Sequence, residues 1–324
     1  MTTITYNMDS TGLPNVGNTC YINSSIQSLL HSVSFKQYIT NHDTHPSIYT
    51  VFDNYNGFIK HLSTILPSYF KVLQQNDVHE FLMYFIDYLF ESKKKSFKLT
   101  KSDTNDVTAY QKLQFKCNTH WFKSFSPIMD VLYFQIVRQT ECYVCKKKNL
   151  NFENQSILEL DIIDDNDSVH KSIVRYFHDQ ILDDWTCDVC KAKSDKNILI
   201  QRLWFLPQTF IICIKRFKFL NNKMSKLKHP IDIPPTLNFK STCLQKNIHY
   251  AYKLSSVINH IGTSYYGHYN SDLIRSDQSI IKIDDESIIK SNVTLNEQNC
   301  YILFYEQSTG WHHHSYILLS WRLS

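Results

Sequence analysis

Residues 12–21 read Gly-Leu-Pro-Asn-Val-Gly-Asn-Thr-Cys-Tyr, and they place one thiol, that of Cys20, at the end of an irregular loop. Glycine and proline keep the approach irregular, and Asn18 and Thr19 are residue types that favour helix starts. Apolar residues at the spacing of one helical face follow at residues 22–33. The pattern predicts a thiol at a helix N-terminus, where unpaired N–H groups and the helix dipole favour the thiolate. The alternative is a small buried cysteine that packs a helix start, which the polar neighbours on the loop side disfavour.

The composition indicates a globular chain without a nucleic-acid or membrane function. The 324 residues are 43% hydrophobic, enough for a substantial core, and the formal net charge is only +4. A nucleic-acid binder would concentrate far more positive charge on one face. Residues 1–10 lack a secretory apolar segment, and no apolar run approaches the about 20 residues that span a bilayer. We therefore expect a soluble protein of the cytoplasm, the nucleus or both, with neither nucleic acid nor membrane as a partner.

Helix-type patterns come first along the chain and strand-type patterns later, which predicts an α+β fold. Residues 52–66 and 77–91 carry the period of amphipathic helices, and Asp77 with Glu80 resembles a capping box. One further helix is expected at residues 168–182. The strand patterns lie at residues 131–138, 156–160, 198–204, 209–219, 252–260, 269–274, 280–283 and 300–305. The active groove is expected between the helical lobe and the sheet.

A cysteine nucleophile needs a base, and the base needs a group that orients it. Among the fifteen histidines, His268 is distinctive because a glycine-bounded loop at residues 262–267 delivers it to the start of a strand. Asp284 and Asp285 end the next strand, where a carboxylate can accept a hydrogen bond from the imidazole. Adjacent aspartates at a turn are more often plain turn residues, so this pattern is weak by itself.

Six boxes of sequence share their residues and their order with one enzyme family. The boxes are GLxNxGNTCYxNS at residues 12–24, QNDVHEFL at 75–82, YxLxxVIxHxG at 252–262, GHY at 267–269, DD at 284–285 and YxLFY at 301–305. Together they span nearly the whole chain. In these boxes the chain resembles the ubiquitin-specific protease family of deubiquitinases.

The resemblance implies roles for the residues around the thiol. Cys20 is then the nucleophile, His268 is the general base, and Asp284 matches the third position of the triad. Asn15, five residues before the cysteine, is implied as a side-chain donor to the oxyanion, alongside the backbone N–H of Cys20. Whether Asp284 or Asp285 is the dominant carboxylate stays open at this point.

The resemblance also implies a substrate, namely ubiquitin attached through its C-terminal glycine, and ubiquitinated proteins as partners. Asp77 and Glu80 could pair with the arginines of ubiquitin's tail, or they could simply cap their helix. The residues implied for substrate binding are Gln75, Asp77, Glu80, Tyr266 and Gly267. The expected function is therefore that of a thiol-dependent deubiquitinase. The alternatives are a catalytically inactive ubiquitin-binding module and a protease for a ubiquitin-like modifier.

The fold that the resemblance implies is that of a papain-like cysteine protease with a helical thumb, a β-rich palm and a zinc-bearing fingers subdomain. The expected boundaries are a leader at residues 1–11, a catalytic domain at 12–307 and a tail at 308–324. Within the catalytic domain we expect the thumb at about 12–125, the fingers at about 131–220 and the palm in the remaining strands. The tail continues neither the helix nor the strand pattern, so we expect it to be loosely ordered.

Two Cys-x-x-Cys pairs predict a structural metal site. Nine cysteines, an odd number, suit a reducing compartment with metal-binding or catalytic thiols better than a disulfide framework. The paired cysteines are Cys142, Cys145, Cys187 and Cys190. Two such pairs make the four-sulfur tetrahedron that Zn²⁺ prefers, and here they would join the tips of two hairpins. A single pair could be a redox couple, but two pairs without thioredoxin-like flanks favour structural zinc. The pairs also match the zinc-bearing fingers of the resembled family.

Overall fold

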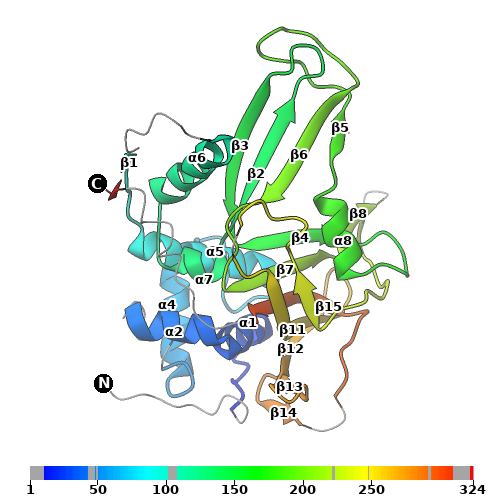
Figure 1. Ribbon diagram of the computed structural model, residues 1–324. Helices are drawn as coiled ribbons and strands as arrows, with labels where there is room; N and C mark the ends of the chain where they lie inside the picture. Colours follow the sequence, from blue (N-terminus) through cyan, green and yellow to red (C-terminus); the bar gives the residue numbers. More distant parts are fainter. Residues whose placement is uncertain are drawn as a thin grey trace.

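The computed structural model describes residues 11–42, 48, 50–100, 108–220, 223–246, 248–290, 293–308 and 322–323. The first helices gather in one lobe, which Figure 1 shows in blue, cyan and blue-green. They are α1 (Cys20–His31), α2 (Val33–His42), α4 (Tyr55–Ile65), α5 (Val78–Lys93), α6 (Ala109–Lys123) and α7 (Ile128–Leu132). The helices expected at residues 52–66 and 77–91 correspond to α4 and α5.

An eight-stranded sheet forms the second part of the molecule. Its order is β14-β13-β12-β11-β15-β7-β4, and β10 pairs with β11 beside this path. The strands are β4 (Ile157–Asp161), β7 (Thr209–Lys215), β10 (Thr236–Asn238), β11 (Ala251–Gly262), β12 (Gly267–Ile274), β13 (Ile280–Asp284), β14 (Ser287–Ile289) and β15 (Cys300–Gln307). All neighbours are antiparallel except β4 and β7, which run parallel.

A separate four-stranded sheet of order β3-β2-β6-β5 projects away from the two lobes (Figure 1). It consists of β2 (Phe134–Glu141), β3 (Lys148–Gln155), β5 (Gln180–Leu182) and β6 (Asn197–Leu203). The expected fingers range of 131–220 thus contains strands of both sheets, because β4 and β7 belong to the large one. Two smaller pairs are β8 (Phe217–Leu220) with β9 (Lys223–Lys226) and β1 (Leu99–Thr100) with β16 (Arg322–Leu323).

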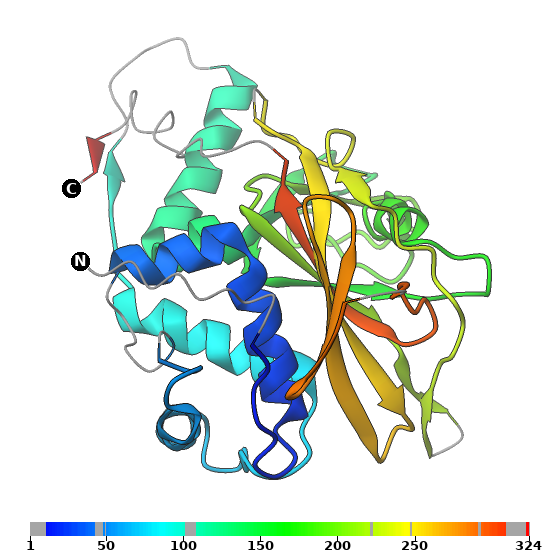
Figure 2. The same cartoon turned by 90° about the horizontal axis from the view of Figure 1, so that it is seen from below.

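The helix α1 lies at the centre of the fold, between the helical lobe and the sheet. It packs against β11, β12 and β13 on one side and α2 and α5 on the other (Figure 2). Every residue from 20 to 30 is buried. Two of its serines, Ser24 and Ser25, donate to the Tyr21 carbonyl within the helix, so their buried hydroxyls are hydrogen-bonded. A helix enclosed on both sides holds its first residue, Cys20, in a fixed place.

Three expected elements were wrong in their bounds. The strand expected at 209–219 divides at Arg216 into β7, in the large sheet, and β8, which pairs with β9. The strand expected at 131–138 begins only at Phe134, because residues 128–132 form α7. The helix expected at 168–182 ends at Tyr176 as α8 (Val169–Tyr176), and residues 180–182 become β5 by pairing with β6. Local apolar spacing does not reveal such pairing, which depends on a strand distant in sequence.

Among the described residues, no helix combines the length and the apolar character needed to cross a bilayer. The expected leader at 1–11 and the tail at 308–324 lie almost wholly outside the described residues. From the tail, Arg322–Leu323 pairs with Leu99–Thr100 as β16 against β1.

Candidate active site

The thiol of Cys20 lies at the first position of α1, as the loop pattern predicted. The side chain is 5% exposed. The loop before it turns through two residues of positive φ, Gly17 at 123° and Asn18 at 56°. Thr19 makes no side-chain cap for the helix. Free backbone N–H groups at this helix start therefore lie beside the sulfur.

His268 lies on β12 and is held by a carboxylate from β13. Its Nε2 is 2.5 Å from Oδ1 of Asp284. The pKa of the imidazole is raised to about 9, first by a side-chain hydrogen bond with Cys20 and then by Asp284, against the lowering effect of burial. With Nε2 engaged by Asp284, Nδ1 is the ring nitrogen left for the thiol. The structure thus brings together three side chains that are up to 264 positions apart in sequence, from Cys20 to Asp284.

The two adjacent aspartates point in different directions. Asp285 Oδ2 lies 3.9 Å from the His268 Nε2, too far for a hydrogen bond. Instead the Asp285 carboxylate accepts from Asn15 Nδ2 at 2.8 Å and from Asn23 Nδ2 at 2.7 Å. Asp284 therefore orients the imidazole, whereas Asp285 holds the loop that precedes the thiol. The sequence boxes included Asn23 but assigned it no role.

Asn15 is fixed at both ends of its amide. Its Oδ1 accepts from the backbone N–H groups of Gly17 at 3.1 Å and Thr19 at 3.2 Å, while Nδ2 donates to Asp285. An amide nitrogen carries two hydrogens, so one remains for a further acceptor. The amide is held close to the start of α1, where the sequence predicted an oxyanion donor.

A groove of about 480 Å³ runs past the thiol between the helical lobe and the sheet. All five residues expected to bind substrate line it: Gln75, Asp77, Glu80, Tyr266 and Gly267. Gln75 Nε2 reaches the Gly267 carbonyl at 3.5 Å, so the two lobes touch across the groove. Tyr266 is open to solvent, with 76% of its surface exposed.

Asp77 serves the fold and the groove at once. Its Oδ1 caps α5 by accepting from the backbone N–H groups of His79 at 2.7 Å and Glu80 at 3.2 Å. Its Oδ2 accepts from the Tyr301 hydroxyl at 2.9 Å, which ties the helical lobe to β15. The Glu80 carboxylate remains exposed at the groove, in the first turn of the same helix.

An aromatic wall completes the groove, and the sequence patterns did not predict it. The wall consists of Phe217, His260, Tyr269 and Tyr301. The His260 ring lies 4.8 Å from Tyr269 in a tilted arrangement and 5.2 Å from Phe217 in an edge-to-face arrangement, measured between ring centroids. Burial lowers the pKa of His260 to about 4, with further lowering by Lys226 and His268, so this imidazole is neutral near pH 7. His260, Tyr269 and Tyr301 lie in the quoted boxes. They come together only because the strands that carry them, β11, β12 and β15, are neighbours in the sheet.

The sequence of this chain matches one protein family over almost its whole length. Residues 11–305 match the family described as "Ubiquitin carboxyl-terminal hydrolase". The chain belongs to this family.

The relatives of this chain share only a small part of its sequence. A Drosophila pseudoobscura pseudoobscura protein, "Ubiquitin carboxyl-terminal hydrolase 36", is 25% identical over 91% of this chain and 29% of its own length. An Arabidopsis thaliana protein, "Ubiquitin carboxyl-terminal hydrolase 4", is 26% identical over 95% of this chain and 92% of its own length. The chain therefore spans less than a third of the Drosophila relative.

Solved structures with a similar fold support the expected α+β architecture. The structure of "the SAGA Ubp8/Sgf11/Sus1/Sgf73 DUB module bound to ubiquitin aldehyde" aligns with a TM-score of 0.75 at 18% identity, covering 95% of this chain and 71% of that one. A second structure, of "the Ubp8-Sgf11-Sgf73-Sus1 SAGA DUB module", aligns with a TM-score of 0.67 at 20% identity, covering 93% of this chain and 68% of that one. At these identities the likeness shows the fold alone, and it confirms the predicted fold class.

The four paired cysteines of this family member meet at the far end of the four-stranded sheet. Their sulfur atoms all lie within 4.8 Å of one another, with Cys142 to Cys190 and Cys145 to Cys187 both at 3.7 Å. The two pairs sit in matching turns. Lys146 N–H donates to the Cys142 carbonyl and Lys191 N–H to the Cys187 carbonyl, and both lysines have φ of 57°. This arrangement can hold a metal ion.

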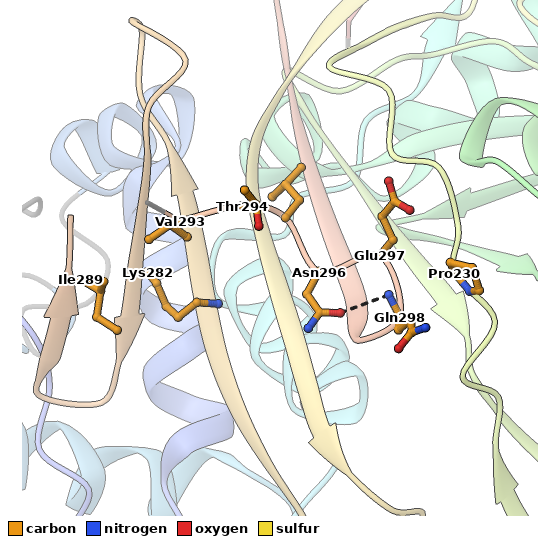
Figure 3. Close-up of a pocket in the computed structure, with 9 residues that line it drawn as sticks. Pro230, Lys282, Ile289, Val293, Thr294, Asn296, Glu297 and Gln298 are labelled. Carbon is orange, nitrogen blue, oxygen red and sulfur yellow. Dashed lines mark hydrogen bonds between the residues drawn. The ribbon is translucent and has the colours of Figure 1, made fainter. Parts of the chain in front are cut away.

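A second hollow, of about 580 Å³, lies on the sheet side, and none of its lining residues belongs to the groove at Cys20 (Figure 3). Lys282 lines it and pairs with the fully buried carboxylate of Asp272 at 2.7 Å. Ile289 and Val293 form part of its apolar rim. Asp272 thus neutralises the lysine of this hollow.

Proposed function

We propose that this chain is a thiol-dependent deubiquitinase that hydrolyses the isopeptide or peptide bond at the C-terminal glycine of ubiquitin. The observation that carries the proposal is the meeting of Cys20, His268 and Asp284 at one end of a groove. Family membership supports the same activity. Because the chain spans only part of some relatives, the activity is proposed for this chain on its own geometry.

The proposed reaction is an acyl transfer in two stages. His268 Nδ1 takes the proton of the Cys20 thiol, and the thiolate attacks the carbonyl carbon of the ubiquitin glycine. The tetrahedral oxygen accepts from the Cys20 backbone N–H and the free hydrogen of Asn15 Nδ2. The imidazolium then protonates the leaving amine, which breaks the C–N bond and leaves a thioester. In the second stage His268 takes a proton from water, which attacks the thioester and releases ubiquitin and the Cys20 thiol.

Asp284, rather than Asp285, is proposed as the third member of this triad. We expect Asp284→Asn to lower kcat by about 10- to 150-fold, since a hydrogen bond to a charged group contributes about 1.5–3 kcal/mol. The pH above which activity is lost (the alkaline limit) should also be lower in this variant, because Asp284 helps to raise the pKa of His268. Asp285→Asn is the matched comparison and should leave that limit unchanged. Steady-state kinetics across pH would contradict the assignment if only Asp285→Asn moved the limit.

The groove is proposed to hold the extended C-terminal tail of ubiquitin. The two walls of the groove approach each other where Gln75 meets Gly267, which suits a tail that ends in glycine. The carboxylates of Asp77 and Glu80 lie along the same groove and can pair with arginines of the tail. Capping by Asp77 and substrate binding are compatible, because only Oδ1 is used by the helix N–H groups.

The proposed contact of Glu80 can be tested without disturbing the reacting atoms. Glu80→Gln should raise KM for a ubiquitin reporter by about fivefold with little change in kcat, because an exposed charge pair contributes about 1 kcal/mol. Glu91→Gln is the control, since Glu91 lies on the same helix and pairs with Lys94. An equal rise in KM for both variants would show a general charge effect and contradict the contact.

Zn²⁺ is the metal we propose for the four-cysteine site. A tetrahedral zinc ion with bonds of about 2.3 Å to sulfur requires sulfur atoms about 3.8 Å apart. The 3.7 Å separations of Cys142 from Cys190 and Cys145 from Cys187 fit this requirement. The ion would join two turns that are far apart in sequence and so hold the end of the fingers together.

Loss of the proposed zinc should destabilise the protein. A cross-link closing a loop of this length contributes about 4 kcal/mol, so Cys187→Ser is expected to lower Tm by roughly 6 °C. Metal analysis should give one zinc per chain for the wild type and none for the variant. Lys147→Ala, at an exposed neighbouring position, is the control. A wild type without bound metal, or a variant with unchanged Tm, would exclude a structural zinc site.

The boundaries of the catalytic domain are proposed at residues 12–307, with residues 1–11 and 308–324 outside it. The thumb comprises the helices up to about residue 125. The fingers comprise the four-stranded sheet between 134 and 203, which is narrower than the expected range of 131–220. The palm comprises the eight-stranded sheet.

One experiment tests the substrate class and the nucleophile together. The chain is treated with ubiquitin that carries an electrophile at its C-terminus, and the modified residue is mapped by mass spectrometry. We expect a covalent adduct on Cys20. Probes built on ubiquitin-like modifiers serve as the comparison, and preferential labelling by one of them would point to that modifier instead. Binding of ubiquitin without any adduct or turnover would identify an inactive binding module.

A further inference from the structure

The turn that carries both aspartates rests directly on the loop that leads to the thiol. This turn joins β13 to β14, where Asp284 pairs with Ser287. Gly12 lies against it so closely that a Cβ at this position would be 2.5 Å from the Asp285 carbonyl oxygen. The same Cβ would be 2.6 Å from the Cα of Glu286. Both neighbours are backbone atoms, so no side-chain rotation could relieve the contact.

Several hydrogen bonds depend on this close approach. Leu13 N–H donates to the Asp285 carbonyl at 3.0 Å, beside Gly12. The side chain of Asn23 donates to the carbonyl of Leu13 at 3.3 Å and to the Asp285 carboxylate at 2.7 Å. Asn23 is itself buried and accepts from the Tyr55 hydroxyl. The loop, the turn and α1 thus form one interlocked contact.

We infer that Gly12 is a positioning residue, whose missing side chain lets the turn approach the loop closely enough for Asp284 to reach His268 and Asp285 to reach Asn15. Gly12 touches neither substrate nor the reacting atoms and acts only through the two aspartates. The inference rests on the proposed deubiquitinase function only for its effect on rate. Its effect on His268 is independent of any substrate.

A side chain at Gly12 must push the turn away from the loop. The groups that face His268 are then changed on one side only: Asp284 and Asp285 withdraw, whereas Cys20 on α1 and His260 on β11 stay. Losing a carboxylate lowers the affinity of the imidazole for its proton. We therefore expect the pKa of His268 to fall from about 9 in Gly12→Ala. We also expect kcat to fall at least tenfold, with KM little changed.

The matched control is Gly57→Ala. Gly57 lies in the first turn of α4, and a Cβ there would press on the Asn54 side chain at 2.4 Å. That contact involves a capping side chain far in sequence from the turn, so Gly57→Ala should keep the wild-type titration of His268. Gly57→Ala therefore shows how far a side chain at a crowded glycine destabilises the fold when the turn at Asp284 is untouched.

The test follows His268 by NMR from about pH 5 to about pH 10 in the wild type, Gly12→Ala, Gly57→Ala and Asp284→Asn. The His268 signal is assigned by its loss in His268→Asn. We expect Gly12→Ala to titrate like Asp284→Asn, to bind ubiquitin and to unfold cooperatively. A wild-type titration in Gly12→Ala would overturn the inference. So would loss of folding or of ubiquitin binding, because Gly12 would then serve the whole fold. A wild type without hydrolase activity would refute the proposed function but leave this titration decisive.

Discussion

Replacing Cys20 with alanine should abolish hydrolysis of a ubiquitin C-terminal amide, with a loss of about 10⁴-fold or more in kcat. The reason is that no other thiol among the described residues lines the groove, which leaves the reaction without a nucleophile. Ubiquitin binding should persist, since the removed sulfur is small and the groove walls are unchanged. The measurement combines single-turnover hydrolysis with a direct binding assay.

The control for this variant is Cys243→Ala, at a cysteine outside the groove whose sulfur contacts the Trp204 carbonyl at 3.6 Å. It should retain wild-type activity. Retained hydrolysis in Cys20→Ala would refute the nucleophile assignment, whereas loss of both binding and activity would indicate a folding defect.

The second large effect is expected at His268. His268→Asn should lower kcat by about 10⁴-fold, because the thiol loses its base and the leaving amine loses its acid. In the wild type the pKa of His268 is raised to about 9, first by Cys20 and then by Asp284. A raised pKa means that the imidazolium persists below about pH 9 and is lost as the pH rises through that value. The pH profile of kcat/KM should therefore fall on the alkaline side near pH 9.

The free energy of unfolding should change with pH in the same direction as the activity. The stabilisation that His268 gains from its partners is fully present below about pH 6.5 and is lost as the pH rises through about 9. His170→Asn is the control, since His170 is exposed on α8. If kcat/KM of His268→Asn still falls near pH 9, a group other than His268 sets the alkaline side of the activity profile.

Much of the fold was predictable because its signals are local. The period of α5, the cap at Asp77 and the strand-ending position of Asp284 can each be read from a few neighbouring residues. The two Cys-x-x-Cys turns are likewise complete local units. The polar strand β3 escaped prediction because its sequence, KNLNFENQ, has little apolar alternation, and it exists by pairing with β2.

The sequence by itself determined the candidate nucleophile, base, carboxylates and metal ligands, since each stands in a distinctive short pattern. Only the tertiary structure distinguished Asp284 from Asp285, assembled the aromatic wall around His260 and set Gly12 against the turn. Adjacent residues at a turn share their local propensities, so their side-chain directions depend on which distant groups lie on each side. Those distant groups, His268 for one aspartate and Asn15 with Asn23 for the other, are brought there by the packing of α1 between the two lobes.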